Sequence, residues 1–139
     1  MSTLPSRHVA VRIEAPATEV YGFVADPTNL PRWAAGLASS AVELHEGRWV
    51  TDSPMGTVEI AFAPRNDLGV LDHDVTLPSG EIVTNPMRAL PNEDGCDLVF
   101  TVRRRPDMSD EDFERDVAAV QADLDTLARL LGRPGAPVP

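Results

Sequence analysis

The chain has 139 residues, a size that fits one domain with a hydrophobic core of its own. Its 22 acidic side chains against 12 basic ones give a formal charge of −10, which repels nucleic-acid phosphates and anionic lipid headgroups. All 12 basic residues are arginines, which excludes a lysine Schiff base and a Walker-type phosphate site. The single Cys96 excludes an intrachain disulfide and multi-cysteine zinc sites, and we expect a structural thiol.

The first residues lack the apolar run of a signal peptide, and no segment approaches the roughly 20 apolar residues of a membrane span. We therefore predict a cytoplasmic protein without a nucleic-acid partner and without stable membrane insertion. We expect it to be a monomer or a homodimer.

A half-buried strand is predicted over residues 8–14, because apolar and polar residues alternate there. Pro16 suits the first turn of the short helix that follows. Asp26 as N-cap and Pro27 as first helical residue predict a second short helix. The apolar residues of these three elements are Val9, Val11, Ile13, Val20, Tyr21, Phe23, Val24, Leu30 and Trp33.

Residues 38–105 follow a period of two that is broken by five turns, which predicts a six-stranded antiparallel meander. One strand lies near 56–63 and another near 96–105. The turns are expected at 46–47, 53–54, 66–67, 78–80 and 92–95.

A long amphipathic helix closes the domain. Ser109 is its predicted N-cap, and the acidic residues 110–112 suit the positive end of the helix dipole. Apolar residues then recur at spacings of 3 and 4 up to Gly132, which is expected to end the helix. The stripe consists of Phe113, Val117, Val120, Leu124, Leu127 and Leu131.

This order of elements predicts an α+β fold, in which a curved seven-stranded antiparallel sheet wraps around the long C-terminal helix. The two short helices after the first strand would close one end. If they hold the sheet away from the long helix, the space between becomes a cavity.

Three segments carry a resemblance to a known family: VRIEAPATEVYGFVADPTNLPRW (11–33), LGVLDH (68–73) and NPMR (85–88). Together with the closing helix they resemble the START/Bet v 1-like superfamily, also called the polyketide cyclase/dehydrase and lipid transport group. The resemblance implies a helix-grip domain over 7–132. We expect the N-terminus (1–6) to be flexible, and the Pro-rich composition of residues 133–139 predicts a disordered tail. The resemblance also implies a deep pocket between sheet and helix, but no invariant catalytic residue, since members include carriers, cyclases, hydroxylase components and chaperone activators.

His73 lies between Asp72 and Asp74, yet strand alternation places it on the opposite face, together with Leu71 and Val75. We expect the imidazole to point inward. It is either a hydrogen-bonded core residue or a polar anchor in a cavity. His73 is also the candidate catalytic residue.

The turn at 78–80 decides which residues face His73. A three-residue loop with a left-handed glycine pairs His73 with Asn85 and turns Met87 inward. We favour this loop because Val83 and Met87 suit an apolar face. A two-residue loop reverses the strand, and the inward residues are then Ile82, Thr84 and Arg88.

Trp33 and Trp49 are the only tryptophans. An indole is large and needs a hydrogen-bond acceptor when buried, so each either packs an element in place or lines a cleft. Tyr21 likewise either packs its helix or presents its phenol to a cavity. The arginine run 103–105 is either a solvated strand end facing 110–112 or an anion handle at a cavity mouth, which Arg65 and Arg88 could join.

Nucleophile, zinc and nucleotide-binding motifs are absent from the sequence, so we predict no metal and no cofactor. We predict a protein that binds a hydrophobic or amphipathic small molecule, lipid-like or polyketide-like, between the sheet and the C-terminal helix. The alternatives are a polyketide aromatase/cyclase with His73 as acid/base and a protein-interaction module of the chaperone-activator type. The candidate ligand-binding residues are Tyr21, Trp33, Trp49, Phe62, His73, Asn85, Met87, Phe100, Val120 and Leu124.

Overall fold

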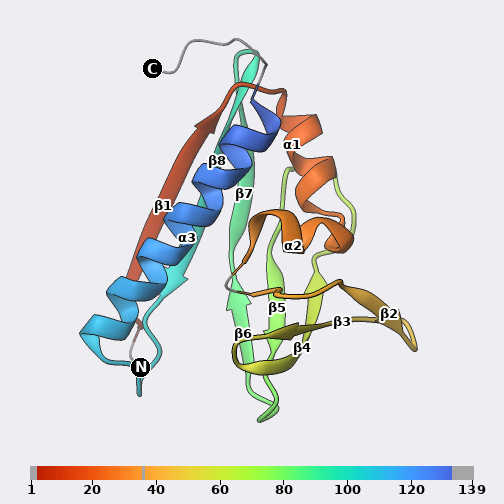
Figure 1. Cartoon of the computed structure of the whole chain (residues 1–139). Helices are drawn as coiled ribbons and strands as arrows, with labels where there is room; N and C mark the ends of the chain where they lie inside the picture. The colour runs from red at the N-terminus through yellow and green to blue at the C-terminus, as the bar shows by residue number, and fades with distance from the viewer. Residues whose placement is uncertain (1–2, 36, 133–139) are drawn as a thin grey trace.

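The computed structural model describes residues 3–35 and 37–132. One long helix lies along a curved antiparallel sheet system, with two short helices beside it (Figure 1). The elements are β1 (Ser6–Ile13), α1 (Ala17–Val24), η1 (Pro27–Asn29), α2 (Leu30–Trp33), β2 (Glu43–His45), β3 (Arg48–Ser53), β4 (Gly56–Phe62), β5 (His73–Thr76), β6 (Ile82–Asn85), β7 (Met87–Asn92), β8 (Gly95–Arg103) and α3 (Asp110–Leu131).

The α+β fold with its gripped C-terminal helix is confirmed, but the strand count differs from the seven expected. Eight strands form two sheets, in the orders β1-β8-β7 and β2-β3-β4-β5-β6. The extra strand arises at Pro86, which divides the strand expected between the turns at 78–80 and 92–95 into β6 and β7. Proline has no N–H to donate, and at this residue the chain changes partner from β5 to β8.

Hydrogen bonds still connect the two sheets across this break. The carbonyl oxygen of Pro86 accepts from the N–H of Thr101 at 2.9 Å, and that of Met87 accepts from the N–H of Leu71 at 2.9 Å. Asp72 accepts from the N–H of Met87 at 2.8 Å and pairs with Arg88. The two sheets therefore act as one curved surface.

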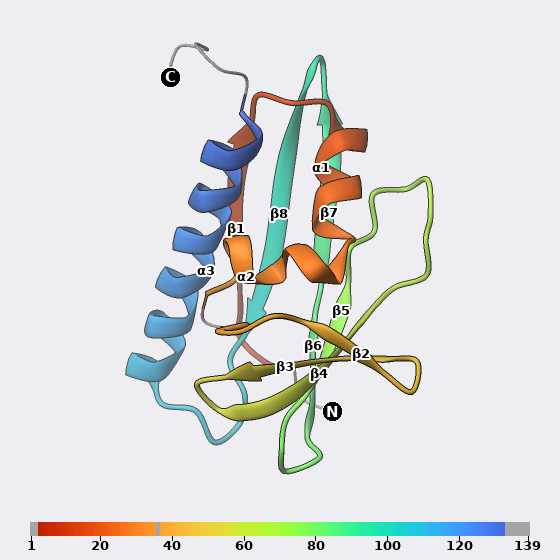
Figure 2. The same cartoon turned by 45° about the vertical axis from the view of Figure 1, so that its right-hand side comes forward.

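Helix α3 packs against β1 and β8, and α2 packs against α3. Figure 2 shows α2 between α3 and the crossing strands β3 and β4. The core between these layers contains Ile13, Leu98, Leu124 and Leu127, all without solvent exposure. Because α2 lies between the middle of α3 and the strands β3 and β4, the layers diverge there.

The predicted helix ends are confirmed. The Ser109 hydroxyl accepts from the N–H of Asp112 at 3.0 Å, and α3 spans Asp110–Leu131. Asp26 accepts from the N–H of Thr28 at 3.0 Å and caps the second short helix, which begins as a 3-10 turn. The predicted tail 133–139 lies outside the described residues, as do residues 1–2 of the predicted flexible N-terminus, whereas β1 already begins at Ser6.

Candidate functional site

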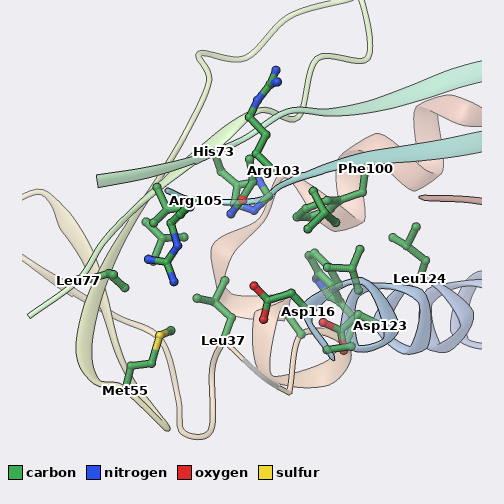
Figure 3. A pocket seen from close by; sticks show the side chains of 18 residues that line it. Leu37, Met55, His73, Leu77, Phe100, Arg103, Arg105, Asp116, Asp123 and Leu124 are labelled. Carbon is green, nitrogen blue, oxygen red and sulfur yellow. The ribbon is translucent and has the colours of Figure 1, made fainter. Parts of the chain in front are cut away.

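A cavity of about 230 Å³ opens where the layers diverge, between α3, α2, the end of β8 and the hairpin of β5 and β6 (Figure 3). Its inner end contains buried residues such as Trp33 and Leu124, while the exposed Met55 and Arg103 mark its mouth. The lining residues are Trp33, Ala34, Leu37, Met55, His73, Val75, Leu77, Val83, Asn85, Phe100, Val102, Arg103, Arg105, Asp116, Ala119, Val120, Asp123 and Leu124.

The β5–β6 turn has the three-residue form that the sequence favoured. The N–H of Leu77 donates to the carbonyl oxygen of Glu81 at 2.8 Å, and Gly80 has a φ of 91°. His73 is therefore the cross-strand neighbour of Asn85, and both line the cavity. Ile82, inward in the alternative register, is 60% exposed.

His73 is held in one orientation at the inner wall of the cavity. Its Nδ1 lies 3.0 Å from the carbonyl oxygen of Leu71, which can only accept, so Nδ1 carries the proton. Phe62 and Phe100 flank the imidazole, with ring centroids at 5.0 and 5.7 Å. Burial lowers the pKa of His73, although Leu71 and the nearby carboxylates oppose that effect. The neutral imidazole thus keeps Nε2 as a hydrogen-bond acceptor.

The wall formed by α3 carries two carboxyl groups. Asp116, Val120 and Asp123 follow one another at helical spacings of 4 and 3, so one face of α3 presents all three to the cavity. Burial raises the pKa of Asp123 to about 7, and no nearby charge opposes it. Burial also raises the pKa of Asp116, where Arg105 partly offsets the effect. Figure 3 shows Asp116 and Arg105 on opposite sides of the cavity.

Trp33 ends α2 and is 3% exposed. Its Nε1–H is buried and has no hydrogen-bond partner among the residues that the structure describes. Buried donors are almost always paired in native proteins, because an unmet donor costs free energy. This indole is therefore an unsatisfied group at the edge of the cavity.

The arginine run divides between its two predicted roles. Arg104 pairs with Asp110 at 2.7 Å, as expected of a strand end facing the acidic helix start. Arg103 and Arg105 line the cavity mouth, and Arg105 also pairs with Glu81 at 3.2 Å. Arg65 and Arg88 lie elsewhere: Arg88 pairs with Asp72, and Arg65 lies over the ring of Tyr21 at 5.3 Å.

Six of the ten candidate ligand-binding residues line the cavity, and four do not. The hydroxyl of Tyr21 accepts from the N–H of Asn66 at 3.0 Å and anchors the loop before β5. Trp49 and Phe62 line a separate groove with Ile60. Met87 is buried in the core, because the strand has changed partner after Pro86. The six in the cavity are Trp33, His73, Asn85, Phe100, Val120 and Leu124.

The candidate set lacks Leu37, Met55, Asp116 and Asp123. Asp116 and Asp123 lie four residues before and three residues after Val120, beside the apolar stripe of the helix. This spacing is visible in the sequence and could have predicted that both carboxyl groups face the cavity. Leu37 and Met55 lie in a loop and a turn, where no periodicity marks the inward side.

The carboxylates beside His73 point away from it, as strand alternation predicted. Asp72 pairs with Arg88, and Asp74 accepts from the hydroxyl of Thr84 at 2.6 Å. Within residues 3–35 and 37–132, histidine, cysteine and acidic side chains form no group of three that could hold a metal. Burial raises the pKa of Cys96 to about 11, as expected of a structural thiol.

None of the helices in the described part of the chain is long and apolar enough to cross a membrane.

Several solved structures share this fold. The protein XoxI from Bacillus cereus has 13% sequence identity and a TM-score of 0.71, over 92% of this chain and 96% of its own. The Zhui aromatase/cyclase from Streptomyces sp. R1128 has 20% identity and a TM-score of 0.63, over 98% and 100%. Ara h 8.0201 has 12% identity and a TM-score of 0.65, over 93% and 98%. At these identities the likeness concerns the fold alone.

The sequence was also compared with curated proteins and with family models. No curated protein matches it. The model of one family, described as polyketide cyclase / dehydrase and lipid transport, matches residues 6–132. The helix-grip architecture, the cavity under α3 and this match over nearly the whole chain agree, and the protein belongs to the polyketide cyclase/dehydrase and lipid transport family within the START/Bet v 1-like superfamily.

Proposed function

We propose that the protein binds a hydrophobic or amphipathic small molecule, lipid-like or polyketide-like, in the cavity under α3. The observation that carries this proposal is the lining: valine, leucine and aromatic side chains surround a few separate polar groups. Such a composition is typical of ligand sites, because apolar area supplies affinity and a few polar groups orient the ligand. The family match supports the same ligand class.

A panel of fatty acids, isoprenoids and aromatic polyketides tests this proposal by thermal shift and by nitrogen-15 NMR. A ligand at 100 times its Kd stabilises the folded state by about 2.7 kcal/mol, which raises Tm measurably. Val120→Phe fills the cavity and should abolish binding. Val117→Phe, a half-buried residue of α3 outside the cavity, is the matched control and should retain it. Absence of any ligand-induced shift across the panel would contradict the proposal.

His73 supports a second candidate, a cyclase-like enzyme. Its neutral imidazole lines the cavity with Nδ1 fixed by Leu71, so Nε2 can take a proton from a carbon between two ketones. The resulting carbanion would attack a second carbonyl carbon of the same chain, and the alkoxide formed would receive the proton from Nε2. The cavity contributes proximity by folding a flexible polyketone, and Asn85 beside His73 orients it.

The enzyme hypothesis is tested with a poly-β-ketone and the His73→Ala variant. Loss of cyclised product in a variant that remains folded supports His73 as the base. The exposed His45, which does not line the cavity, supplies the control variant His45→Ala, which should keep full activity. Undiminished activity in His73→Ala would exclude His73 from the mechanism.

A further inference from the structure

The carboxyl group of Asp123 is a polar group in the cavity whose hydrogen-bonding capacity the protein leaves unmet. It is half-buried on α3, and it forms no hydrogen bond or ion pair with the residues that the structure describes. The neighbouring acidic residues of the helix differ: Asp116 lies within the influence of Arg105, and the exposed Asp125 accepts from Gln121 at 3.0 Å. An unpaired carboxylate beside apolar walls costs free energy unless a ligand supplies a donor.

A second unmet group lies on the helix that packs against α3. Trp33 ends α2 and has a buried Nε1–H without an acceptor among the described residues. Asp123 lacks a donor and Trp33 lacks an acceptor, and both side chains belong to the lining of one cavity. A hydroxyl group carries both functions, because its oxygen donates one hydrogen bond and accepts others, and its O–H suits the Asp123 carboxylate.

We propose that Asp123 is the ligand-recognition residue of this cavity and that its carboxylate accepts a hydrogen bond from a hydroxyl group on an otherwise apolar ligand. This inference rests on the proposed binding function and narrows the ligand class to hydroxylated apolar molecules, such as phenols and alcohols. A hydrocarbon of the same shape fills the cavity but leaves the carboxylate desolvated and unpaired. A ligand carboxylate would be repelled by Asp123 and would find its partners at the mouth, on Arg103 and Arg105.

The proposal predicts a pH dependence, since the carboxylate is a better acceptor than the neutral acid. Burial raises the pKa of Asp123 to about 7, so affinity for a hydroxyl donor should rise between pH 5.5 and pH 8. The other ionisable groups in the cavity are His73, Arg103, Arg105 and Asp116. Burial lowers the pKa of His73, which favours its neutral form. Asp123→Asn isolates the contribution of Asp123 from that of Asp116.

The experiment compares two probes of similar shape, 2-naphthol and 2-methylnaphthalene, on the full chain at both pH values. Nitrogen-15 NMR of the two indole N–H groups reports where they bind. Trp33 should shift, while Trp49, which lies outside the cavity, provides the internal reference. Titration of these shifts gives the Kd of each probe.

We expect the wild-type protein to prefer 2-naphthol at pH 8 by about tenfold, the typical gain of a hydrogen bond to a charged group. This preference should shrink at pH 5.5. It should fall at least threefold in Asp123→Asn and lose its pH dependence there. Asp125→Asn is the matched control on the solvent side of α3 and should behave like the wild type.

Two results would overturn the inference in distinguishable ways. Equal affinity for both probes, or an unchanged pH-dependent preference in Asp123→Asn, would remove Asp123 from recognition and leave cavity binding intact. If neither probe shifts the Trp33 signal at millimolar concentration, the proposed binding function fails and this inference fails with it.

Discussion

Leu124 and Leu127 provide a direct measurement of where the core ends and the cavity begins. Both are fully buried on α3, yet Leu124 lines the cavity and Leu127 does not. Truncation to alanine removes three carbon atoms at either position, a transfer loss of about 2.4 kcal/mol at ~0.8 kcal/mol each. A second loss comes from the contacts that neighbouring atoms give up when a new void forms.

This second loss separates the two variants. Leu127 is surrounded by packed atoms, so Leu127→Ala should cost about 4 kcal/mol in total. Leu124 borders the cavity, so the space that Leu124→Ala leaves joins a cavity that already exists, and the variant should cost about 2.5 kcal/mol and should enlarge the cavity. The milder variant is therefore expected to change ligand affinity more.

Urea unfolding followed by circular dichroism measures both free energies, and titration with 2-naphthol measures binding. Leu130→Ala is the matched control, because Leu130 is 42% exposed on the same helix and its loss should cost less than about 0.5 kcal/mol. Equal large losses at 124 and 127 with unchanged binding would mean a closed core along the whole helix. The cavity and every function attached to it would then be refuted.

Two further predictions concern the site and the sheet junction. The folded-state pKa of Asp123, about 7, lies above the unfolded value of 3.8, so the folded protein binds this proton more tightly and loses stability as pH rises between them. Asp123→Asn should remove this dependence of stability on pH. After allowance for solvent screening, the variant's free energy of unfolding at pH 8 should exceed that of the wild type by about 1–3 kcal/mol. Urea unfolding at pH 5.5 and pH 8 measures this, and the same change with pH in the variant and in the wild type would refute the prediction. Gly69→Ala should cost more than about 2 kcal/mol, because φ is 71° and the new Cβ overlaps the carbonyl oxygen of Ala89. Gly80→Ala is the control, because φ is 91° but no described atom lies within 4 Å of the new Cβ, and it should cost only about 1 kcal/mol. Equal losses of stability in the two glycine variants would contradict the predicted overlap at Gly69.

The sequence determined the features that depend on neighbouring residues. Ser109 and the acidic residues after it set the start of α3, and the glycine of the 78–80 turn set the register that pairs His73 with Asn85. Alternation along β5 turned His73 inward. These features are predictable because capping, turn geometry and strand facing act over only a few residues.

Only the tertiary structure decided which inward residues meet a cavity and which meet the core. Leu124 and Leu127 are the same residue type in one stripe, and Trp33 and Trp49 are both cavity candidates from sequence, yet only one of each pair lines the cavity. The division at Pro86 likewise became visible only when β7 was seen to pair with β8. The physical reason is that a cavity exists where separate layers fail to meet, and that depends on how α2, α3 and the sheet pack over long sequence distances.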